Sequence, residues 1–240
     1  MEIQEKKPKY RRVLLKLSGE ALACGANDIL DFDFIHQVAG VIKKCTAAGV
    51  QVAVLCGGGN IWRGRQGGKM NRSRADHMGM LATTINALAL QDTFLQEGID
   101  ATVMTAVEMK AFAEFYTARD AVRALEQGRV VIFGAGLGAP FFSTDTAAVL
   151  RAAEIEADVV LMAKNIDGVY NADPKLDPNA VRYDELTYLE ILQKELRALD
   201  MTAASFSRDN QIACYAFGLS DPNNIYRVVM GERIGTEIHN

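Results

Sequence analysis

The sequence of 240 residues predicts an α/β fold of three layers (αβα), in which an open, mostly parallel sheet carries helices on both faces. Two observations lead to this prediction. Short apolar runs bounded by glycine or polar residues alternate along the chain with segments of helical periodicity. Most of the runs are continuously apolar, as expected of strands covered on both faces. No internal repeat or Pro/Ser-rich linker is found, so residues 1–240 are expected to form one domain.

The expected strands follow one another along the chain, with helices between them. They are residues 12–17, 50–56, 100–104, 129–135, 157–163 and 213–219. Residues 34–45 and 78–95 carry apolar side chains at helical spacing, which predicts a helix in each place. The other helices are expected at residues 119–127, 144–155, 187–196 and 202–211. Asp-Pro turns at residues 173–174 and 177–178 indicate an excursion such as a small hairpin.

Composition excludes several classes of protein. The formal net charge is −4, from 26 Lys and Arg against 30 Asp and Glu, so no nucleic-acid partner is expected. Residues 1–10 contain a short basic run that is typical of a flexible, solvated tail. The four cysteines show no Cys-x-x-Cys spacing, which argues against disulfides and structural zinc. No apolar stretch is long enough to cross a bilayer, so we expect a soluble cytoplasmic protein without a membrane partner.

A run of three glycines after the second expected strand is the most informative feature of the chain. Gly57, Gly58 and Gly59 close this strand, and Arg63 follows four residues later. In a parallel sheet, ligands bind beyond the carboxyl ends of the strands. Glycine amides can approach a phosphate closely, and an arginine adds a permanent, forked cation. The pattern favours a phosphate-binding loop, although a tight strand-to-helix turn would use the same glycines.

The first expected strand ends in a second candidate phosphate site. Lys16 closes this strand, and Ser18 and Gly19 follow it. A lysine in this place can meet a nucleotide phosphate or can simply stand at a fraying strand end. Two familiar phosphate motifs are excluded. Residues 59–64 have P-loop spacing but continue with Arg-Gln instead of Lys-Ser/Thr, and residues 136–138 lack the third glycine of a dinucleotide fingerprint.

Three aspartates stand where helices are expected to begin. They are Asp76, Asp145 and Asp200. Each could cap the helix that follows, which is the usual role of an aspartate in this position. Asp76 could instead accept hydrogen bonds from sugar hydroxyls, and Asp145 could help to hold a metal-bound phosphate. After the fifth strand, the segment at residues 163–174 could hold a nucleobase and a ribose.

Together these stretches resemble the amino-acid kinase superfamily, and within it the bacterial uridylate (UMP) kinases. The resemblance extends from residue 12 to residue 236. The segments at residues 16–22, 57–60 and 167–174 are shared across that superfamily and specify the fold and phosphoryl transfer. Two narrower segments, residues 76–83 and 140–145, point to UMP as the acceptor.

The resemblance implies an activity and its partners. The activity is ATP-dependent phosphorylation of UMP to UDP in pyrimidine nucleotide synthesis. The implied cofactors are ATP and Mg²⁺, with the Mg²⁺ carried by ATP and no metal site on the protein. A cytoplasmic homohexamer is implied, and part of the family has a GTP activator or a UTP inhibitor.

Site residues are implied position by position. The ATP contacts are Lys16, Leu17, Ser18, Gly19, Gly59, Arg63, Lys164, Asn165, Tyr170 and Asp173. The UMP contacts are Gly58, Asp76, Leu137, Gly138, Ala139, Pro140, Phe141, Phe142, Ser143 and Thr144, with Asp76 on the ribose. The catalytic residues are Lys16, Arg63, Asp145 and Asp200, with Asp200 orienting Lys16.

Two departures from the family pattern bear on specificity and regulation, and a third, Ala75 in place of a usual glycine, is minor. Leu137 and Ala139 replace a threonine and an asparagine that the family usually has near the uracil. Residues 24–31 lack the sequence that part of the family uses for GTP activation. Two other functions are weighed against UMP phosphorylation. One is a kinase of the same superfamily acting on a carboxylate or carbamate, and the other is a non-catalytic nucleotide-binding assembly.

Overall fold

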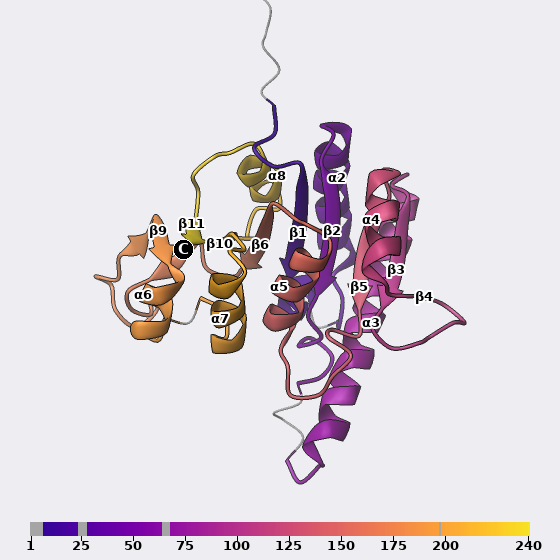
Figure 1. Cartoon of the computed structure of the whole chain (residues 1–240), viewed down its shortest axis with the longest axis horizontal. Coiled ribbons are helices and arrows are strands. Elements are labelled where there is room, and N and C mark those ends of the chain that lie inside the picture. Colours follow the sequence, from indigo (N-terminus) through magenta and orange to yellow (C-terminus); the bar gives the residue numbers. More distant parts are fainter. Residues whose placement is uncertain (1–6, 24–27, 64–67, 197) are drawn as a thin grey trace, which may run out of the picture.

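A parallel sheet organises the chain, seen in a computed structural model that describes residues 7–23, 28–63, 68–196 and 198–240 (Figure 1). Within these residues the sheet has nine strands, which in spatial order are β4 (Glu114–Phe115), β3 (Ala101–Thr105), β5 (Val130–Gly134), β2 (Gln51–Cys56), β1 (Arg12–Leu17), β6 (Val159–Lys164), β10 (Cys214–Gly218), β11 (Thr236–His239) and β9 (Glu185–Thr187). Among the described strands of this sheet, neighbours run parallel except β10 and β11. Two further strands, β7 (Val169–Tyr170) and β8 (Arg182–Tyr183), form a separate antiparallel pair.

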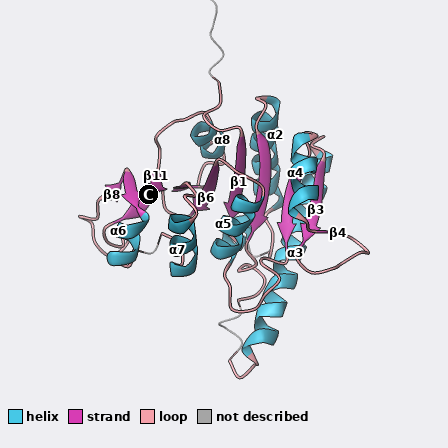
Figure 2. Cartoon of the chain, in the orientation of Figure 1, coloured by secondary structure: helices cyan, strands magenta, loops and turns pink. Residues whose placement is uncertain are grey.

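Helices cover both faces of the sheet, as Figure 2 shows. On one face lie α1 (Gly19–Ala23), α2 (Phe32–Ala47), α3 (Arg72–Gln96) and α8 (Asn224–Val229). On the other lie α4 (Ala118–Glu126), α5 (Thr144–Glu154), α6 (Tyr188–Gln193) and α7 (Met201–Asp209). Each face has its own hydrophobic core. The predicted three-layer α/β fold is therefore confirmed.

Strand β1 shows why the central strands are apolar throughout. Its residues Val13, Leu15 and Leu17 pack in the core beneath α2, while Leu14 packs in the opposite core with α5. Successive side chains of a strand point to opposite faces, so a strand between two layers of helices needs apolar residues at nearly every position. Lys16 is partly exposed, because it stands where the strand reaches the edge of the sheet.

The six predicted strands are all present, with ends shifted by at most two residues. The predicted excursion near the Asp-Pro turns contains the β7–β8 hairpin. The sequence patterns missed β4, β9 and β11, which are only two to four residues long and too short to show a period. The helix expected at residues 187–196 ends earlier, at Gln193.

The expected tail at residues 1–10 is partly attached to the body of the protein. Tyr10 is buried in the core on the face of the sheet that α2 and α8 cover, and the Lys9 amide donates to the Val229 carbonyl at 2.9 Å. These contacts correct the prediction for residues 9 and 10, whereas residues 1–6 lie outside the described residues. Cys45, Cys56 and Cys214 are buried free thiols, and Cys24 is not among the described residues.

Helix α3 exposes large apolar side chains in its first half and buries others in its second half. Met78, Leu81 and Ile85 are exposed, whereas Leu90 and Phe94 are buried in the core that α2 also covers. The amino-terminal half of α3 projects past the carboxyl ends of the strands (Figure 1). Within the described part of the chain, neither α3 nor any other helix combines the length and apolarity that crossing a membrane requires.

Arg12 is a buried cation that joins β1 to its neighbours. Its side chain is 1% exposed; Nε donates to Gln51 Oε1 at 2.7 Å, and Nη1 donates to the Ile155 carbonyl. Glu126 Oε1 lies 3.7 Å from Nη2 and supplies the opposite charge. A buried charge is tolerated only when it is paired and hydrogen-bonded in this way.

We expect Arg12→Met to lower the free energy of unfolding by about 1–3 kcal/mol, since the Ile155 carbonyl and Gln51 would lose their buried donor. Urea unfolding followed by circular dichroism measures the change. The control is Arg11→Met, because Arg11 is the exposed neighbour of Arg12 in sequence. Equal stability of the two variants would contradict a structural role for Arg12.

Candidate active site

The loops that follow β1, β2 and β5 meet at one edge of the sheet. A Cβ atom added to Gly19 would lie 2.6 Å from the Gly59 amide nitrogen. One added to Gly57 would lie 3.0 Å from the Gly19 nitrogen and 3.7 Å from Thr144 Oγ1. Only residues without a side chain fit between these backbones. The two predicted phosphate loops are therefore in direct contact, with the start of α5 beside them.

Lys16 forms an ion pair at this meeting point. Its Nζ lies 2.9 Å from Asp145 Oδ1, and the two side chains are 14% and 19% exposed. Asp145 stands in the first turn of α5, where a carboxylate also interacts favourably with the helix dipole. Lys164, at the end of β6, attracts the same carboxylate electrostatically. Two lysines from neighbouring strands therefore share one aspartate.

The ionisation of these groups follows from burial and from their mutual charges. Burial alone would raise the pKa of Asp145, but Lys16 and Lys164 outweigh it, and the pKa lies below its ordinary value. Burial lowers the pKa of Lys164; Asp145 opposes this shift and Lys16 reinforces it. Asp145 is therefore ionised at neutral pH and can hold a charged Lys16 in place.

Asp200 has a different partner from the one predicted. We expected it to orient Lys16, but that contact belongs to Asp145. Asp200 caps α7, where it accepts from the Ala203 amide at 2.9 Å. It also accepts from the hydroxyls of Ser143 and Thr146, at 3.1 Å for Thr146. The reason is position, because Asp200 stands at the start of α7, where the Ser143 and Thr146 hydroxyls at the start of α5 reach its carboxylate.

A cavity of about 160 Å³ opens beside the glycine loop. Seven predicted acceptor residues line it: Gly58, Asp76, Leu137, Ala139, Phe142, Ser143 and Thr144. Five further lining residues were not predicted: Trp62, Gly79, Met80, Thr83 and Gly136. Gly138, Pro140 and Phe141 are not in the lining. Because Thr144 lines the cavity and Asp145 follows it, the cavity adjoins the Lys16 ion pair.

Asp76 connects α3 to the loop that precedes α5. The capping interpretation was wrong, since the helix begins earlier and Asn71 is its cap, accepting from the Arg74 amide at 3.3 Å. Asp76 Oδ2 accepts from the Phe141 amide at 2.8 Å and pairs with Arg72 Nε at 2.8 Å. The same carboxylate borders the cavity, so it retains the position predicted for contact with a sugar.

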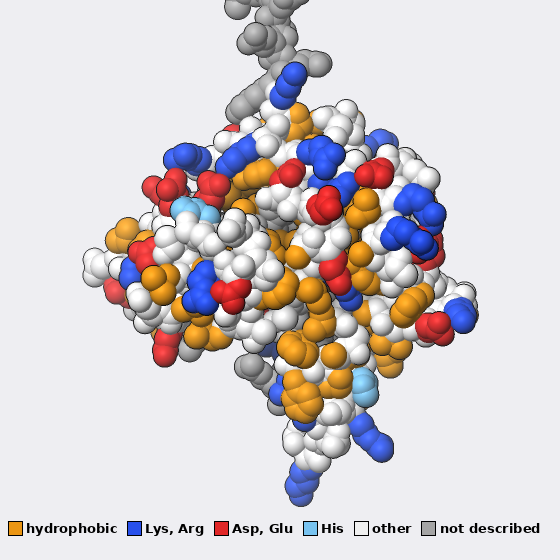
Figure 3. All heavy atoms as spheres, viewed as in Figure 1, with side chains coloured by type: hydrophobic (Ala, Val, Ile, Leu, Met, Phe, Trp, Pro, Cys, Tyr) orange, Lys and Arg blue, Asp and Glu red, His pale blue; other side chains and the backbone are white. Residues whose placement is uncertain are grey.

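Phe141 is held in a strained conformation by these contacts. Its φ is 73°, in the left-handed region that a bulky residue rarely adopts. Its amide is fixed by Asp76, and the Arg72 guanidinium lies 5.4 Å from the centre of its ring. The ring is 66% exposed, and hydrophobic side chains gather over this loop below α5 (Figure 3). Strain of this kind persists where the surrounding structure fixes a functional loop.

A larger hollow of about 490 Å³ lies on the other side of Ser143. Phe141, Leu199 and Met201 line it, together with Asp200. Its lining is mainly apolar and it does not include the glycine loop. The smaller cavity is the better acceptor site, because Gly58 of the glycine loop, Asp76 and Thr144 line it.

The predicted contacts at the end of β1 differ in what they can offer a ligand. Leu17 is fully buried in the core, so a contact through its side chain is excluded and only its backbone is available. The Ser18 hydroxyl accepts from the Ala21 amide at 3.1 Å and caps α1. Arg63 forms an ion pair with Glu20, and both side chains are about half exposed. An incoming phosphate could therefore compete with Glu20 for Arg63.

Asn165, Tyr170 and Asp173 lie on a separate arm after β6. Asn165 is exposed. The Tyr170 hydroxyl donates to Asp167 Oδ1 at 2.7 Å, and Asp173 Oδ1 accepts from the Lys175 amide at 2.9 Å. These contacts are local to the arm. Lys164, at its base, donates through Nζ to the Ala198 carbonyl.

Asn86 supports the glycine loop and was missed by sequence reasoning. It is fully buried on α3; its Nδ2 donates to the Gly57 carbonyl at 2.7 Å and to Asn60 Oδ1 at 2.8 Å. An asparagine among the apolar residues of an expected helix was the signal that could have revealed it, because a buried amide needs partners.

No group of three or more His, Cys, Asp or Glu side chains able to hold a metal ion occurs among the described residues. Asp145 and Asp200, the two carboxylates beside the first turn of α5, are engaged by Lys16 and by hydroxyl groups.

Comparison with known proteins agrees with this geometry. A profile of the amino acid kinase family matches residues 11–217. The chain belongs to the amino acid kinase family. Members of a family share a fold, and the strands that carry Lys16 and the glycine loop both lie within the matched region.

Three solved structures are similar to the chain over nearly its whole length. UMP kinase from Bacillus anthracis is 35% identical over 96% of each chain, with a TM-score of 0.92. UMP kinase from Ureaplasma parvum is 36% identical over 96% of this chain and 99% of its own, with a TM-score of 0.91. Uridylate kinase from Archaeoglobus fulgidus is 29% identical over 94% and 99%, with a TM-score of 0.71.

We expect Asp145→Asn to destabilise the protein by about 1–3 kcal/mol at pH 7, because Lys16 and Lys164 lose their shared counter-charge. The lowered pKa of Asp145 means that its stabilising contribution is fully present above its ordinary pKa of 3.8. This contribution is lost as the pH falls through the lower, folded-state pKa. Urea unfolding at a series of pH values should show the two proteins converging in acid.

The matched control is Asp33→Asn, since Asp33 is an exposed aspartate in the first turn of α2. It should change stability little at any pH. A constant difference between wild type and Asp145→Asn down to the most acid pH would contradict the ion pair as the cause.

Proposed function

We propose that the protein transfers the γ-phosphoryl group of ATP to UMP and forms UDP. The observation that supports this most is the Lys16–Asp145 ion pair at the edge of a cavity lined by Gly58 and Thr144. A cation, bare backbone amides and a cavity are thus brought together at one edge of the sheet. Similarity to two UMP kinases above 30% identity supports UMP as the acceptor.

The proposed donor site lies on the β1 and β6 side. Lys16, Ser18, Gly19, Gly59 and Arg63 contact the phosphates of ATP. For Arg63 this means leaving Glu20, an exchange that costs little because both side chains are half exposed. Lys164, Asn165, Tyr170 and Asp173 contact the rest of ATP.

The proposed acceptor site is the cavity of about 160 Å³. Asp76 accepts from the ribose hydroxyls, Gly58 and Thr144 meet the phosphate, and the loop at residues 137–143 encloses the base. Asp76 also fixes the amide of Phe141, so the residue that binds the sugar shapes the loop around it.

Phosphoryl transfer needs positioning and neutralisation of charge more than covalent help from the protein. Lys16 neutralises charge on the transferred group, and the glycine amides donate to its oxygens. Asp145 holds Lys16, while Asp200 fixes the start of α5 through Ser143 and Thr146. Mg²⁺ bound to ATP would add further positive charge. A general base is unnecessary, because a UMP phosphate oxygen is already anionic near neutral pH.

We expect Lys16→Ala to lower kcat by about 10²-fold or more, the effect of removing one preorganised donor from a developing charge. A coupled assay of UDP formation measures it. Lys43→Ala is the control, since Lys43 is exposed on α2 and donates to the Glu97 carbonyl away from the site. Near-normal turnover by Lys16→Ala would remove Lys16 from the chemistry.

Leu137 and Ala139 make the base end of the cavity apolar. We expect weaker discrimination between UMP and CMP than the about 10⁴-fold achieved by sites that hydrogen-bond a substrate with buried side chains. The measurement is kcat/KM with ATP and a panel of nucleoside monophosphates. Strict selectivity for UMP would show that backbone groups alone read the base.

The same panel separates the two rival functions. Activity with glutamate, aspartate or carbamate and none with UMP would favour a carboxylate or carbamate kinase. Nucleotide binding without turnover would favour a non-catalytic assembly. The narrow match at residues 76–83 and 140–145 argues against the first, and retention of Lys16 beside Asp145 argues against the second.

The cellular setting belongs to the same proposal. We propose a cytoplasmic enzyme of pyrimidine nucleotide synthesis that assembles as a homohexamer. The exposed Met78, Leu81 and Ile85 on α3 support association with further copies, because such a stripe is stabilised by burial. A GTP activator or a UTP inhibitor is an open expectation, since residues 24–27 of the relevant loop lie outside the described residues.

A further inference from the structure

The arm at residues 165–183 is attached to the rest of the protein mainly at its base. It contains β7 and β8, and its outer part carries Leu176, which is 84% exposed. Three of the proposed donor contacts, Asn165, Tyr170 and Asp173, lie on this arm. Their positions relative to β6 therefore depend on what fixes the base.

A buried threonine fixes the inner side of the base. Thr236 Oγ1, on β11, accepts from the Val169 amide at 2.9 Å and donates to the Tyr183 carbonyl at 2.5 Å. Val169 and Tyr183 are opposite each other in the hairpin, so one hydroxyl holds both of its strands. These two hydrogen bonds fix the position of the hairpin's base, but they do not fix the angle at which the hairpin leaves the body of the protein.

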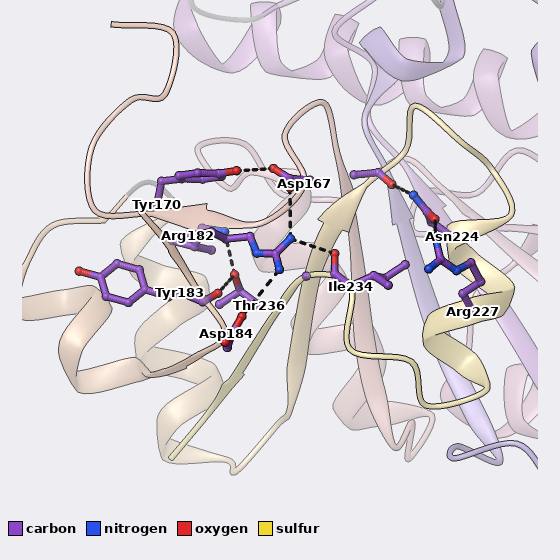
Figure 4. Close-up of polar contacts among 12 residues, drawn as sticks. Asp167, Tyr170, Arg182, Tyr183, Asp184, Asn224, Arg227, Ile234 and Thr236 are labelled. Carbon is purple, nitrogen blue, oxygen red and sulfur yellow. Dashed lines mark hydrogen bonds and ion pairs between the residues drawn. The ribbon is translucent and has the colours of Figure 1, made fainter. Parts of the chain in front are cut away.

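Arg182 connects the outer side of the base to two segments distant in sequence, at Asp167 and Ile234, and also pairs with the nearby Asp184. Its guanidinium lies 3.1 Å from Asp167 Oδ2, 3.4 Å from the Ile234 carbonyl oxygen and 3.7 Å from Asp184 Oδ1 (Figure 4). A Cβ added to Gly168 would lie 2.6 Å from Arg182 Cδ, so the arginine stem packs directly on a glycine. An arginine fork can serve several acceptors at once and thus define an orientation.

Asp167 joins this contact to the proposed ligand residue Tyr170. One carboxylate oxygen receives Arg182 and the other receives the Tyr170 hydroxyl at 2.7 Å. Tyr170 and Arg182 are cross-strand partners in the hairpin, so their side chains share a face. Asp167 itself packs against the end of β10, where a Cβ on Gly218 would lie 3.1 Å from its Cα.

The expected energies of its ion pairs indicate that Arg182 matters more for the orientation of the arm than for the stability of the fold. Each ion pair of Arg182 is partly exposed, and such pairs contribute about 0–1 kcal/mol to folding. A small displacement of a binding group, in contrast, can change a rate or an affinity by tenfold or more.

We propose that Arg182, acting through Asp167, is a positioning residue that orients the arm so that Tyr170 and Asp173 meet the donor nucleotide. This inference rests on the proposed function, because it assigns the arm to the ATP side of that site. The arginine itself does not touch the substrate.

The test compares Arg182→Gln with Arg227→Gln. Arg227 is a matched control, because it lies on α8, away from the arm (Figure 4), and its guanidinium donates to Asn224 at 2.9 Å and to Glu232 at 2.7 Å. We expect Arg182→Gln to raise KM for ATP about tenfold, with KM for UMP and kcat within twofold of wild type. Arg182→Lys should restore only part of the loss, since an ammonium lacks the fork.

Hydrogen exchange supplies a readout that needs no activity. The amides of Asn171 and Val181, bonded within the arm at 3.1 and 2.8 Å, should exchange faster in Arg182→Gln and not in Arg227→Gln. Should Arg182→Gln fail to fold, Asp167→Asn takes its place with the same expected result. Unchanged KM for ATP together with unchanged exchange would overturn the proposal.

The experiments distinguish a failure of the proposed function from a failure of the proposed role of Arg182. If the wild type forms no UDP, the proposed function falls, and calorimetric titration with MgATP then decides the inference. Weaker MgATP binding by Arg182→Gln than by Arg227→Gln supports the positioning role. Equal binding by the two variants overturns it.

Discussion

The ion pair between Lys16 and Asp145 is the interaction on which the site depends. It joins the end of β1 to the first turn of α5, two elements separated by more than a hundred residues in the chain. The parallel order of β2, β1 and β6 makes this possible, because it places the ends of three strands at one edge. Glycines are required around it, since any side chain at Gly19 or Gly57 would strike the neighbouring loop.

Two other aspartates extend the same principle to the surrounding loops. Asp200 joins α7 to α5 through Ser143, and Asp76 joins α3 to the backbone of Phe141. Each carboxylate thus fixes one helix start or loop against another, and the cavity between them takes its shape from these contacts. The left-handed conformation of Phe141 is a measure of how firmly the loop is held.

The sequence patterns could predict the sheet and the residue types of the site, but not their pairing. Continuous apolar runs mark strands between two layers, and glycine and lysine at strand ends mark a phosphate site. The partner of Lys16 depends on which helix begins beside the end of β1, and this is a property of the tertiary structure. Asp145 and Asp200 both stand at predicted helix starts, so their positions in the sequence do not show which of them reaches Lys16. In the same way, the periodicity of α3 predicted a helix, but not that Met78, Leu81 and Ile85 are exposed on it.

We propose that Lys16, held by Asp145, stands between the phosphates of two nucleotides. A crystal structure with a non-hydrolysable ATP analogue and UMP would show this arrangement directly. We expect the γ-phosphate within hydrogen-bond distance of Lys16 Nζ, the glycine-loop amides on the phosphate oxygens and UMP in the cavity beside Asp76. A triphosphate bound away from Lys16 and the glycine loop would show that Lys16 has no part in the transfer.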